Sequence, residues 1–295
     1  MNLVVGATGI LGSEICRGLA AEGKPVRALV RATSDPSKAD TLKRYGATLV
    51  QGDLKERPSL DAACQGVTAV ISTASSTLSR QEGDSIETVD VKGQIGLIDA
   101  AKAAGVNRFV FISFRHDVPN LPCPLSVAKR TVEQHLKASG LTYTILWGNF
   151  FMEVWLSPPL GFDFPNAKAT IYGSGRNKLS WISFRDVAQF AVASLDNPFA
   201  RNATLEVGGP EALSPLEVVA IFEEIGGRQF TVEHMPEESL QAQRASAENP
   251  LLESFATLML MYARGDTMDM QETLKAFPVK LTAVRDYAKS VRTSS

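Results

Sequence analysis

Short apolar stretches rich in β-branched residues alternate with stretches of helical periodicity up to about residue 146. The apolar stretches predict six strands, at Leu3–Val5, Val26–Val30, Thr48–Gln51, Ala69–Ser72, Phe109–Ser113 and Thr142–Leu146. Between them the periodicity predicts helices at Leu11–Glu22, Lys38–Tyr45, Ser59–Ala63, Ile86–Ala104 and Ser126–Ser139. Because the strands are apolar almost throughout, we expect both faces of their sheet to be buried. The pattern predicts an α/β fold, a doubly wound parallel sheet of the Rossmann kind.

The pattern loosens in the second half of the chain. Residues 155–180 are rich in Pro, Gly and Asn, which predicts loops around a cleft. A strand and helix follow at Ser180–Leu195 and another strand at Ala203–Val207, and four helices are expected at Pro215–Glu224, Pro236–Arg244, Leu251–Tyr262 and Asp269–Ala276. We therefore expect a dinucleotide-binding domain at residues 1–152. A smaller α+β substrate lobe is expected at 153–295, partly interleaved with the sheet at about 180–208.

The composition is that of an ordinary globular protein, with 44% hydrophobic and 21% charged residues among 295. A formal net charge of −2 gives no reason to expect nucleic acid or an anionic membrane as a partner. No apolar run approaches the roughly 18 residues of a membrane span, and the first residues carry no signal-peptide pattern. The three cysteines are too scattered for a disulfide framework or a metal site. We expect a cytoplasmic protein without a metal.

A glycine-rich segment, Gly6-Ala7-Thr8-Gly9-Ile10-Leu11-Gly12, follows the first strand and opens the first helix. In such a turn the first glycine permits a tight bend, the second lets a pyrophosphate approach the backbone, and the third allows close helix packing. The helix N-terminus supplies N–H donors and a partial positive charge. The segment predicts a dinucleotide site that includes Gly6, Thr8, Gly9, Ile10, Leu11 and Gly12.

The end of the second strand indicates which dinucleotide binds. NAD enzymes usually carry an acidic residue there, which binds the 2′-hydroxyl of the ribose. This chain has Arg31 instead, with Thr33, Ser34 and Lys38 nearby. A guanidinium pairs with a phosphate, which a carboxylate would repel, so the sequence favours NADP(H) over NAD.

Two further strand ends are expected at the coenzyme. Asp53 and Leu54 close the third strand, where an adenine ring would lie; Asp53 either accepts from the adenine amino group or caps the next turn. Ser72, Thr73 and Ala74 end the fourth strand, and their small size suits a backbone that runs close to the coenzyme.

Several motifs together resemble the NmrA-like family of atypical short-chain dehydrogenases/reductases. They are the glycine turn, Leu29-Val30-Arg31, Gly52-Asp53-Leu54, Val106–Ser113 and the segment that begins at Lys129. The resemblance covers about residues 1–155. It implies an NADP-binding fold whose members include reductases of C=C bonds, quinones or dye-like aromatics, sensors of redox state, and assembly factors. It also implies that Asn149 and Phe150, after the sixth strand, touch the coenzyme.

The catalytic residues depart from those of ordinary short-chain dehydrogenases, which use a Ser, a Tyr and a Lys four residues after the Tyr. Ser113 ends the fifth strand and Lys129 opens the next helix, but Leu125 stands where the Tyr would be. Leucine cannot donate a proton, so the usual carbonyl-reducing mechanism is in doubt. The resemblance suggests that Lys129 binds the nicotinamide ribose and assists proton transfer. His116, just past a strand end, is another candidate proton donor.

The aromatic and methionine side chains after the sixth strand, Phe150, Phe151, Met152 and Trp155, either wall an apolar substrate pocket or belong to the core. The helix at Leu251–Tyr262 forms a lid over that pocket or a dimer face. We expect an NADPH-dependent reductase of a small apolar or aromatic substrate, such as a quinone or enone, that acts by hydride transfer. The alternative is a non-catalytic NADP(H)-binding redox sensor, regulator or assembly factor. A homodimer or a regulatory protein partner is compatible with either.

Overall fold

A computed structural model describes residues 1–78, 81–115 and 121–293 of the chain. The chain divides into two compact units, and each takes residues from several parts of the sequence. The first unit comprises Met1–Phe114, Pro124–Trp147 and Val187–Leu205. The second comprises Arg115–Cys123, Gly148–Asp186 and Glu206–Ser295. The expected division at residues 152 and 153 stays a prediction.

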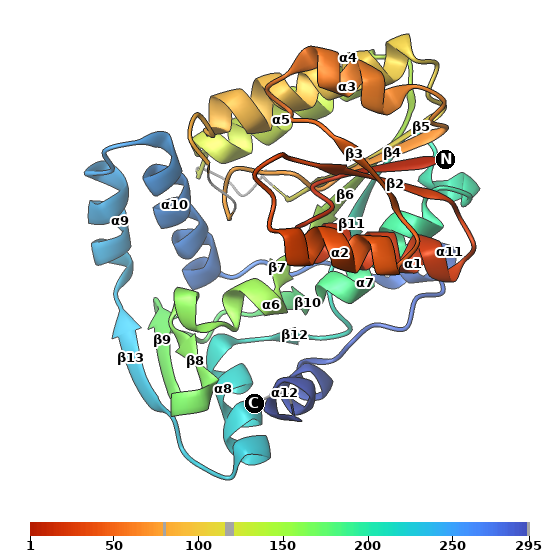
Figure 1. Cartoon of the computed structure of the whole chain (residues 1–295). Coiled ribbons are helices and arrows are strands. Elements are labelled where there is room, and N and C mark those ends of the chain that lie inside the picture. The colour runs from red at the N-terminus through yellow and green to blue at the C-terminus, as the bar shows by residue number, and fades with distance from the viewer. Residues whose placement is uncertain (79–80, 116–120, 294–295) are drawn as a thin grey trace. The chain divides into compact units, whose positions relative to one another are not determined.

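The first unit is built on a seven-stranded sheet in the order β3-β2-β1-β4-β5-β6-β11 (Figure 1). Its strands are β1 (Asn2–Val5), β2 (Val26–Val30), β3 (Thr48–Gln51), β4 (Ala69–Ser72), β5 (Arg108–Ser113), β6 (Thr142–Gly148) and β11 (Ala203–Val207). The strands from β1 to β6 all pair in parallel. The strand order reverses between β1 and β4, and in sheets of this kind ligands bind beyond the carboxyl ends of the strands at such a reversal. The predicted doubly wound sheet is confirmed.

Helices cover both faces of this sheet (Figure 1). One face carries α1 (Ile10–Ala21), α2 (Pro36–Arg44) and α7 (Phe184–Ala193); the other carries α3 (Arg57–Cys64), α4 (Gln94–Ala103) and α5 (Pro124–Ala138). The β5 side chains Phe109 and Phe111 are fully buried in the core. Cys16 and Cys64 are also fully buried, and burial raises the pKa of their thiols to about 12 and about 11. Both cysteines are packing residues.

The single helix expected at Ile86–Ala104 is wrong in one respect. Its first half, η1 (Ile86–Gly93), is a π-helix, and only the second half is α4. At the end of this π-helix the backbone of Gly93 lies close to Leu54, and an added Cβ would lie 2.8 Å from the Cβ of Leu54. Hydrophobic periodicity does not distinguish the two helix types, because both bury the same apolar face.

The second unit contains more regular structure than the sequence predicted. Its strands are β7 (Phe150–Phe151), β8 (Phe162–Asp163), β9 (Lys168–Tyr172), β10 (Leu179–Ile182), β12 (Ala212–Leu213) and β13 (Thr231–Met235). Its helices are α6 (Met152–Trp155), α8 (Pro215–Gly226), α9 (Glu237–Ala245), α10 (Pro250–Arg264), α11 (Gln271–Ala276) and α12 (Val284–Thr293). The expectation of loops alone at residues 155–180 is wrong, because β9 pairs in parallel with β13, about sixty residues later in the chain. No local pattern reports a partner at that distance.

An aromatic cluster forms the core of the second unit around Tyr262 of α10. The ring of Tyr262 stacks on Trp155 at 5.3 Å and meets Phe150, Tyr172 and Trp181 at 5.4–6.0 Å. Burial raises the pKa of the Tyr262 phenol well above its ordinary value. Phe150 and Met152 are buried core residues, whereas Phe151 and Trp155 are only half-buried. The structure therefore assigns Phe150 and Met152 to the core of this unit.

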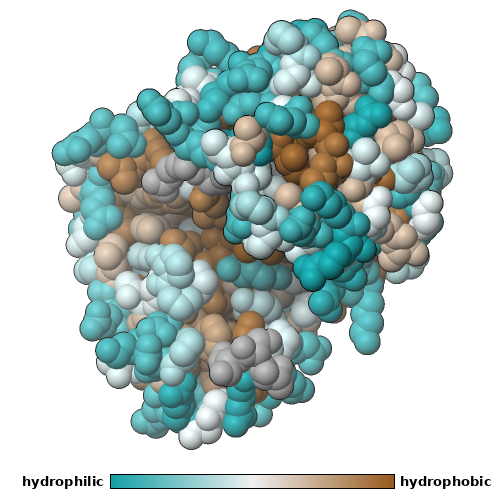
Figure 2. Space-filling view, viewed as in Figure 1, coloured by the Kyte–Doolittle hydropathy of each residue, from teal (hydrophilic) through white to brown (hydrophobic). Residues whose placement is uncertain are grey.

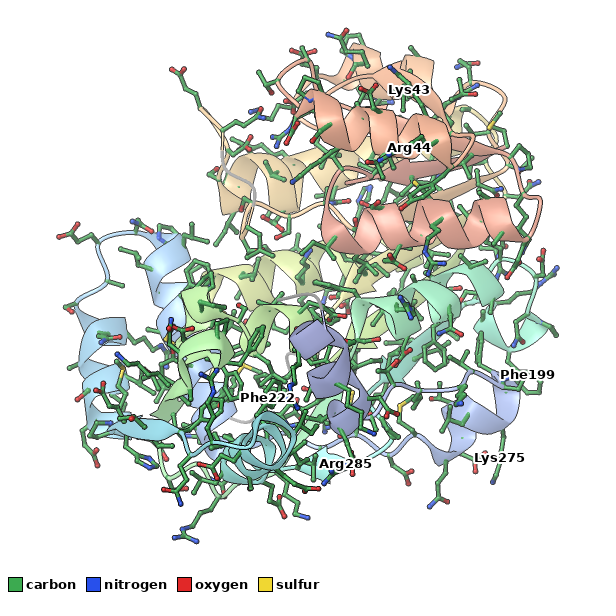
Figure 3. All side chains as sticks on the ribbon, turned by 60° about the horizontal axis from the view of Figure 1, so that its bottom comes forward. Lys43, Arg44, Phe199, Phe222, Lys275 and Arg285 are labelled. Carbon is green, nitrogen blue, oxygen red and sulfur yellow. The ribbon has the colours of Figure 1, made fainter. Side chains whose placement is uncertain are left out.

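The surface of the molecule is mostly hydrophilic in the view of Figure 2, with hydrophobic residues showing in separate patches. Phe199, 70% exposed, stands out among the large apolar side chains (Figure 3). In the second unit Arg285 of α12 donates two hydrogen bonds, of 2.8 and 2.6 Å, to the carboxylate of Glu224 on α8. Across the described ranges, every helix is too short or too polar to cross a membrane.

Candidate functional site

The glycine turn lies between β1 and α1, at the point where the strand order reverses. Gly6 has φ +83°, a left-handed conformation that favours glycine, and the N–H of Gly9 donates to its carbonyl at 3.0 Å. A Cβ on Gly6 would lie 2.6 Å from Oγ1 of Thr73, beside β4. A Cβ on Gly12 would overlap the carbonyl oxygen of Gly6 and lie 2.9 Å from Cα of Ala7. Internal packing therefore explains Gly6 and Gly12.

Internal packing does not explain Gly9. Its φ is −76°, which any residue adopts, and an added Cβ would meet only the carbonyl oxygen of Gly6, at 3.2 Å. The residue is exposed, and so is the next one, Ile10, at 57%. Glycine at this position leaves the space above the turn open to an approaching group. The turn thus fits a pyrophosphate that needs to reach the backbone.

The N-terminus of α1 opens into that space. Gly9 is its N-cap, no side chain in the described part of the chain caps it, and its first turn holds no acidic residue. The first N–H groups of a helix have no partner within the helix and attract anions. Thr8 lies half-buried in the turn, and Leu11 is buried beneath it. The turn and helix together leave uncapped N–H groups at the carboxyl end of β1, an arrangement that suits an anion.

Arg31 lies at the end of β2, as predicted, and it has a partner that the sequence did not indicate. Its Nη1 lies 2.7 Å from Oδ2 of Asp84, a carboxylate that is 1% exposed. Ser34 accepts a hydrogen bond from the backbone N–H of Arg31. The guanidinium is therefore tied to a buried carboxylate at the edge of the expected adenosine site.

The ends of β3 and β4 have local roles of their own. Asp53 accepts from the backbone N–H of Lys55 at 2.8 Å, so it caps a turn, one of the two roles considered for it. Leu54 is buried, 9% exposed. Ser72 donates to Oε1 of Gln94 at 2.8 Å, and Gln94 donates to the carbonyl of Ala74, also at 2.8 Å.

The N–H of Thr73 donates to the carbonyl of Val5 at 2.9 Å. Together with the Gln94 contacts, this bond fixes the backbone after β4 beside the glycine turn.

Lys129 is buried, only 5% exposed, near the start of α5. Its Nζ lies 3.5 Å from Oδ1 of Asp90 and 4.9 Å from the centre of the Phe111 ring. Asp90 lies in η1 and is fully buried; its other oxygen accepts from the N–H and hydroxyl of Ser76 at 3.0 and 2.6 Å. A buried cation is stable only when it is paired, so Asp90 is what allows Lys129 to lie inside the unit.

A second buried acid, Glu133, lies one helical turn after Lys129 on α5. Ser113 donates to Oε1 of Glu133 at 2.6 Å, and the indole N–H of Trp147 donates to the same oxygen at 2.9 Å. Ser113 is 4% exposed and Glu133 fully buried. The hydroxyl hydrogen of Ser113 is therefore directed at the carboxylate, which leaves its oxygen to accept from another group.

The structure does not test the remaining predicted residues at the site. His116 falls outside the described residues. Asn149 and Phe150 belong to the second unit: Asn149 donates to the carbonyl of Asp266 at 3.1 Å, and Phe150 packs in the aromatic cluster. Leu125, where a Tyr would stand, is buried on α5. Their roles at the coenzyme stay predictions.

Sequence reasoning missed Asp84, Asp90 and Glu133. A signal existed for Glu133, since a position four residues after Lys129 lies on the same helix face. Asp84 and Asp90 lie far along the chain from the cations that they bind, Arg31, Lys55 and Lys129. No sequence spacing indicates such pairs, so only the folded chain reveals those contacts.

A protein-family model matches almost the whole chain. The NmrA-like family model matches residues 2–288. The chain belongs to the NmrA-like family. The predicted family is thereby confirmed.

Known relatives of this NmrA-like protein include both reductases and assembly factors. It is 32% identical to the isoflavone reductase homolog IRL of Zea mays, over 97% of this chain and 96% of that protein. It is also 32% identical to the photosystem II assembly factor Ycf39 of Trieres chinensis, over 79% of this chain and 72% of that protein. A solved structure, AtPrR2 with NADP+ and (+)pinoresinol, superposes with a TM-score of 0.79 at 25% identity, covering 98% and 97% of the two chains.

Proposed function

We propose that this NmrA-like protein is an NADPH-dependent reductase of a small apolar or aromatic substrate, such as a quinone or an enone. The proposal depends above all on the environment of Gly9. This glycine is exposed, its φ does not require glycine, and it lies at a helix N-terminus that no described side chain caps. Gly6, Thr8, Gly9, Ile10, Leu11 and Gly12 would hold the pyrophosphate of NADP(H), and Arg31 would face the 2′-phosphate. The relative solved with NADP+ and an aromatic ligand supports this assignment.

Lys129 and Ser113 are the proposed polar groups on the nicotinamide side of the site. The coenzyme would supply the hydride. Lys129, held by Asp90, would donate hydrogen bonds to the ribose hydroxyls and assist proton transfer to the reduced substrate. Ser113 would accept a hydrogen bond, because its own hydrogen goes to Glu133. A quinone or enone can take its proton from water, so the absence of a Tyr at Leu125 is compatible with turnover.

A change at Gly9 tests the coenzyme site. We expect Gly9→Val to weaken NADPH binding about 100-fold or more, because the side chain would separate the pyrophosphate from the helix N–H groups; two lost charge-assisted hydrogen bonds suffice for that factor. The free energy of unfolding should fall by no more than about 1 kcal/mol, since an added Cβ would meet a single backbone atom, the carbonyl oxygen of Gly6 at 3.2 Å, which needs to move by only a few tenths of an ångström. Titration of NADPH fluorescence and urea unfolding measure the two effects. Unchanged NADPH affinity would remove the turn from the site.

Replacement of Lys129 tests the reductase assignment. NADPH oxidation is measured against a panel of quinones, enones and aryl substrates, and we expect Lys129→Met to lower turnover about 100-fold or more. Lys92→Met is the control, because Lys92 is 72% exposed and lies on η1 two residues after Asp90. Circular dichroism and urea unfolding of each variant verify that its fold is intact. Equal turnover by both variants would contradict a role for Lys129.

The second candidate function is a non-catalytic NADP(H)-binding sensor, regulator or assembly factor. Two observations favour it: a buried leucine stands at position 125, and the hydroxyl of Ser113 is engaged by Glu133. The assembly-factor relative also supports it. Tight NADPH binding without turnover of any substrate in the panel would favour this function over the reductase.

A further inference from the structure

Asp84 lies in the loop between β4 and η1 and joins two cations from different strand ends. Its Oδ2 lies 2.7 Å from Nη1 of Arg31, which ends β2, and its Oδ1 lies 2.6 Å from Nζ of Lys55, which follows β3. The carboxylate is 1% exposed, whereas the two cationic side chains are 25% and 26% exposed. Each oxygen of one buried carboxylate thus holds a partly exposed cation.

The loop that carries Asp84 is tied to the same strand ends by further hydrogen bonds. The N–H of Gln81 donates to Oδ2 of Asp84 at 3.0 Å, and Nζ of Lys55 donates to the carbonyl of Glu82 at 3.1 Å. The hydroxyl of Thr33, two residues after Arg31, donates to Oε1 of Gln81 at 2.5 Å. These bonds keep Asp84 against the ends of β2 and β3.

The carboxylate of Asp84 is ionised at neutral pH. Burial by itself would raise the pKa of Asp84, but hydrogen bonds from Lys55, Arg31 and the Gln81 N–H hold that pKa below its ordinary value. Asp53 adds a second acid, with its Oδ2 3.8 Å from Nζ of Lys55. The positive charge that Arg31 and Lys55 present at the expected adenosine site is therefore partly neutralised before any ligand arrives.

A phosphate monoester competes well for two cations held in this way. It presents three strongly accepting oxygens and nearly two negative charges, where a carboxylate presents two oxygens and one charge. A ribose hydroxyl carries no charge and cannot compete. Arg31 and Lys55 can therefore exchange the Asp84 carboxylate for the 2′-phosphate of NADPH, but NADH offers them no group that competes.

We propose that Asp84 determines the coenzyme preference: it gathers Arg31 and Lys55 into one cation pair, and the 2′-phosphate of NADP(H) exchanges with its carboxylate for them. The proposal rests on the proposed function, because it assumes that the adenosine lies at the ends of β2 and β3. It adds Lys55 as a second cation for the phosphate. It also makes Asp84 an internal competitor that weakens NADPH binding without affecting NADH.

The test compares the dissociation constants of NADPH and NADH, because a purely structural role would change both alike. We expect Asp84→Asn to raise the preference for NADPH over NADH about tenfold, since it removes one competing charge in contact with both cations. Lys55→Met should lower the same preference about tenfold. Glu82→Gln is the matched control: it removes one charge two residues away, at an exposed side chain, and should leave the preference unchanged.

The outcomes separate this proposal from the proposed function. The role of Asp84 is overturned if Asp84→Asn leaves the preference for NADPH within twofold of the wild-type value or lowers it. It is also overturned if Glu82→Gln shifts the preference by the same factor. Equal weakening of both coenzymes would do the same. If the wild type does not prefer NADPH, or if Arg31→Met leaves the preference unchanged, the NADP(H) assignment itself fails. Should Asp84→Asn not fold, an unchanged preference in Lys55→Met is sufficient to reject the cation pair.

Discussion

Replacing Asp90 with alanine is expected to lower the free energy of unfolding by about 3–5 kcal/mol, the usual cost of leaving a buried charge without its partner. Lys129 is 5% exposed, and the carboxylate 3.5 Å from its Nζ is fully buried. The nearby Phe111 ring cannot replace a full negative charge, because a desolvated cation–π contact contributes about 2 kcal/mol or somewhat more, which is less than the loss of the buried partner costs. Urea unfolding followed by circular dichroism measures the loss.

A double variant distinguishes the charge effect from simple loss of packing. Asp90→Leu combined with Lys129→Met removes both charges and keeps side chains of similar length and branching, so it should be more stable than Asp90→Ala alone. Ser76→Ala is a milder control; it removes one hydrogen bond to Asp90 and should cost about 1 kcal/mol. If Asp90→Ala loses less than about 1 kcal/mol, the pair does not hold Lys129 inside the unit.

The second large effect is expected at Gly12. A methyl group there would lie 2.7 Å from the carbonyl carbon of Gly6 and 2.9 Å from Cα of Ala7, and backbone atoms in a tight turn cannot give way as a side chain can. Gly12→Ala should therefore lower the free energy of unfolding by about 1–3 kcal/mol. It should also weaken NADPH binding about 100-fold, because displacement of the turn misaligns at least two helix N–H donors.

Gly96 on α4 provides the matched control. It is also a helical glycine of the first unit, but an added Cβ would meet only Cδ1 of Leu60, at 3.8 Å, an ordinary contact. Gly96→Ala should stabilise the protein by about 0.4–1 kcal/mol and leave NADPH affinity unchanged. Similar losses in both variants would show that the helices do not tolerate alanine in general and would contradict a specific clash at Gly12.

Glycine is favoured at each of the three positions of the turn for a different physical reason. The sequence suggested these reasons, and the structure makes them testable. Gly6 adopts a positive φ, and Gly12 lies against backbone atoms. Gly9 has an ordinary φ, and an added Cβ would meet one backbone atom, the carbonyl oxygen of Gly6, at 3.2 Å. The proposed pyrophosphate gives a further reason for glycine at that position. It predicts that Gly9→Val is stable but does not bind NADPH, whereas Gly12→Ala is unstable.

The sequence by itself determined the sheet, the phosphate turn and the family. The strands Val26–Val30, Thr48–Gln51 and Ala69–Ser72 were predicted with the bounds they have in the structure, because each is a short apolar run between turn signals. Short parallel strands and a glycine turn have local signatures, since the backbone conformation of each residue depends mainly on nearby positions. Arg31 and Lys129 were found for the same reason, through their places at a strand end and a helix start.

Only the tertiary structure decided which side chains hold those residues and how the second half is built. Asp84 reaches Arg31 across 53 positions, Asp90 reaches Lys129 across 39, and β9 pairs with a strand about sixty residues away. The energy of an ion pair or a strand pairing depends on distance in space, and the same short sequence is compatible with many partners. The residues proposed to carry chemistry were therefore visible in the sequence, while the contacts that position them became visible only after folding.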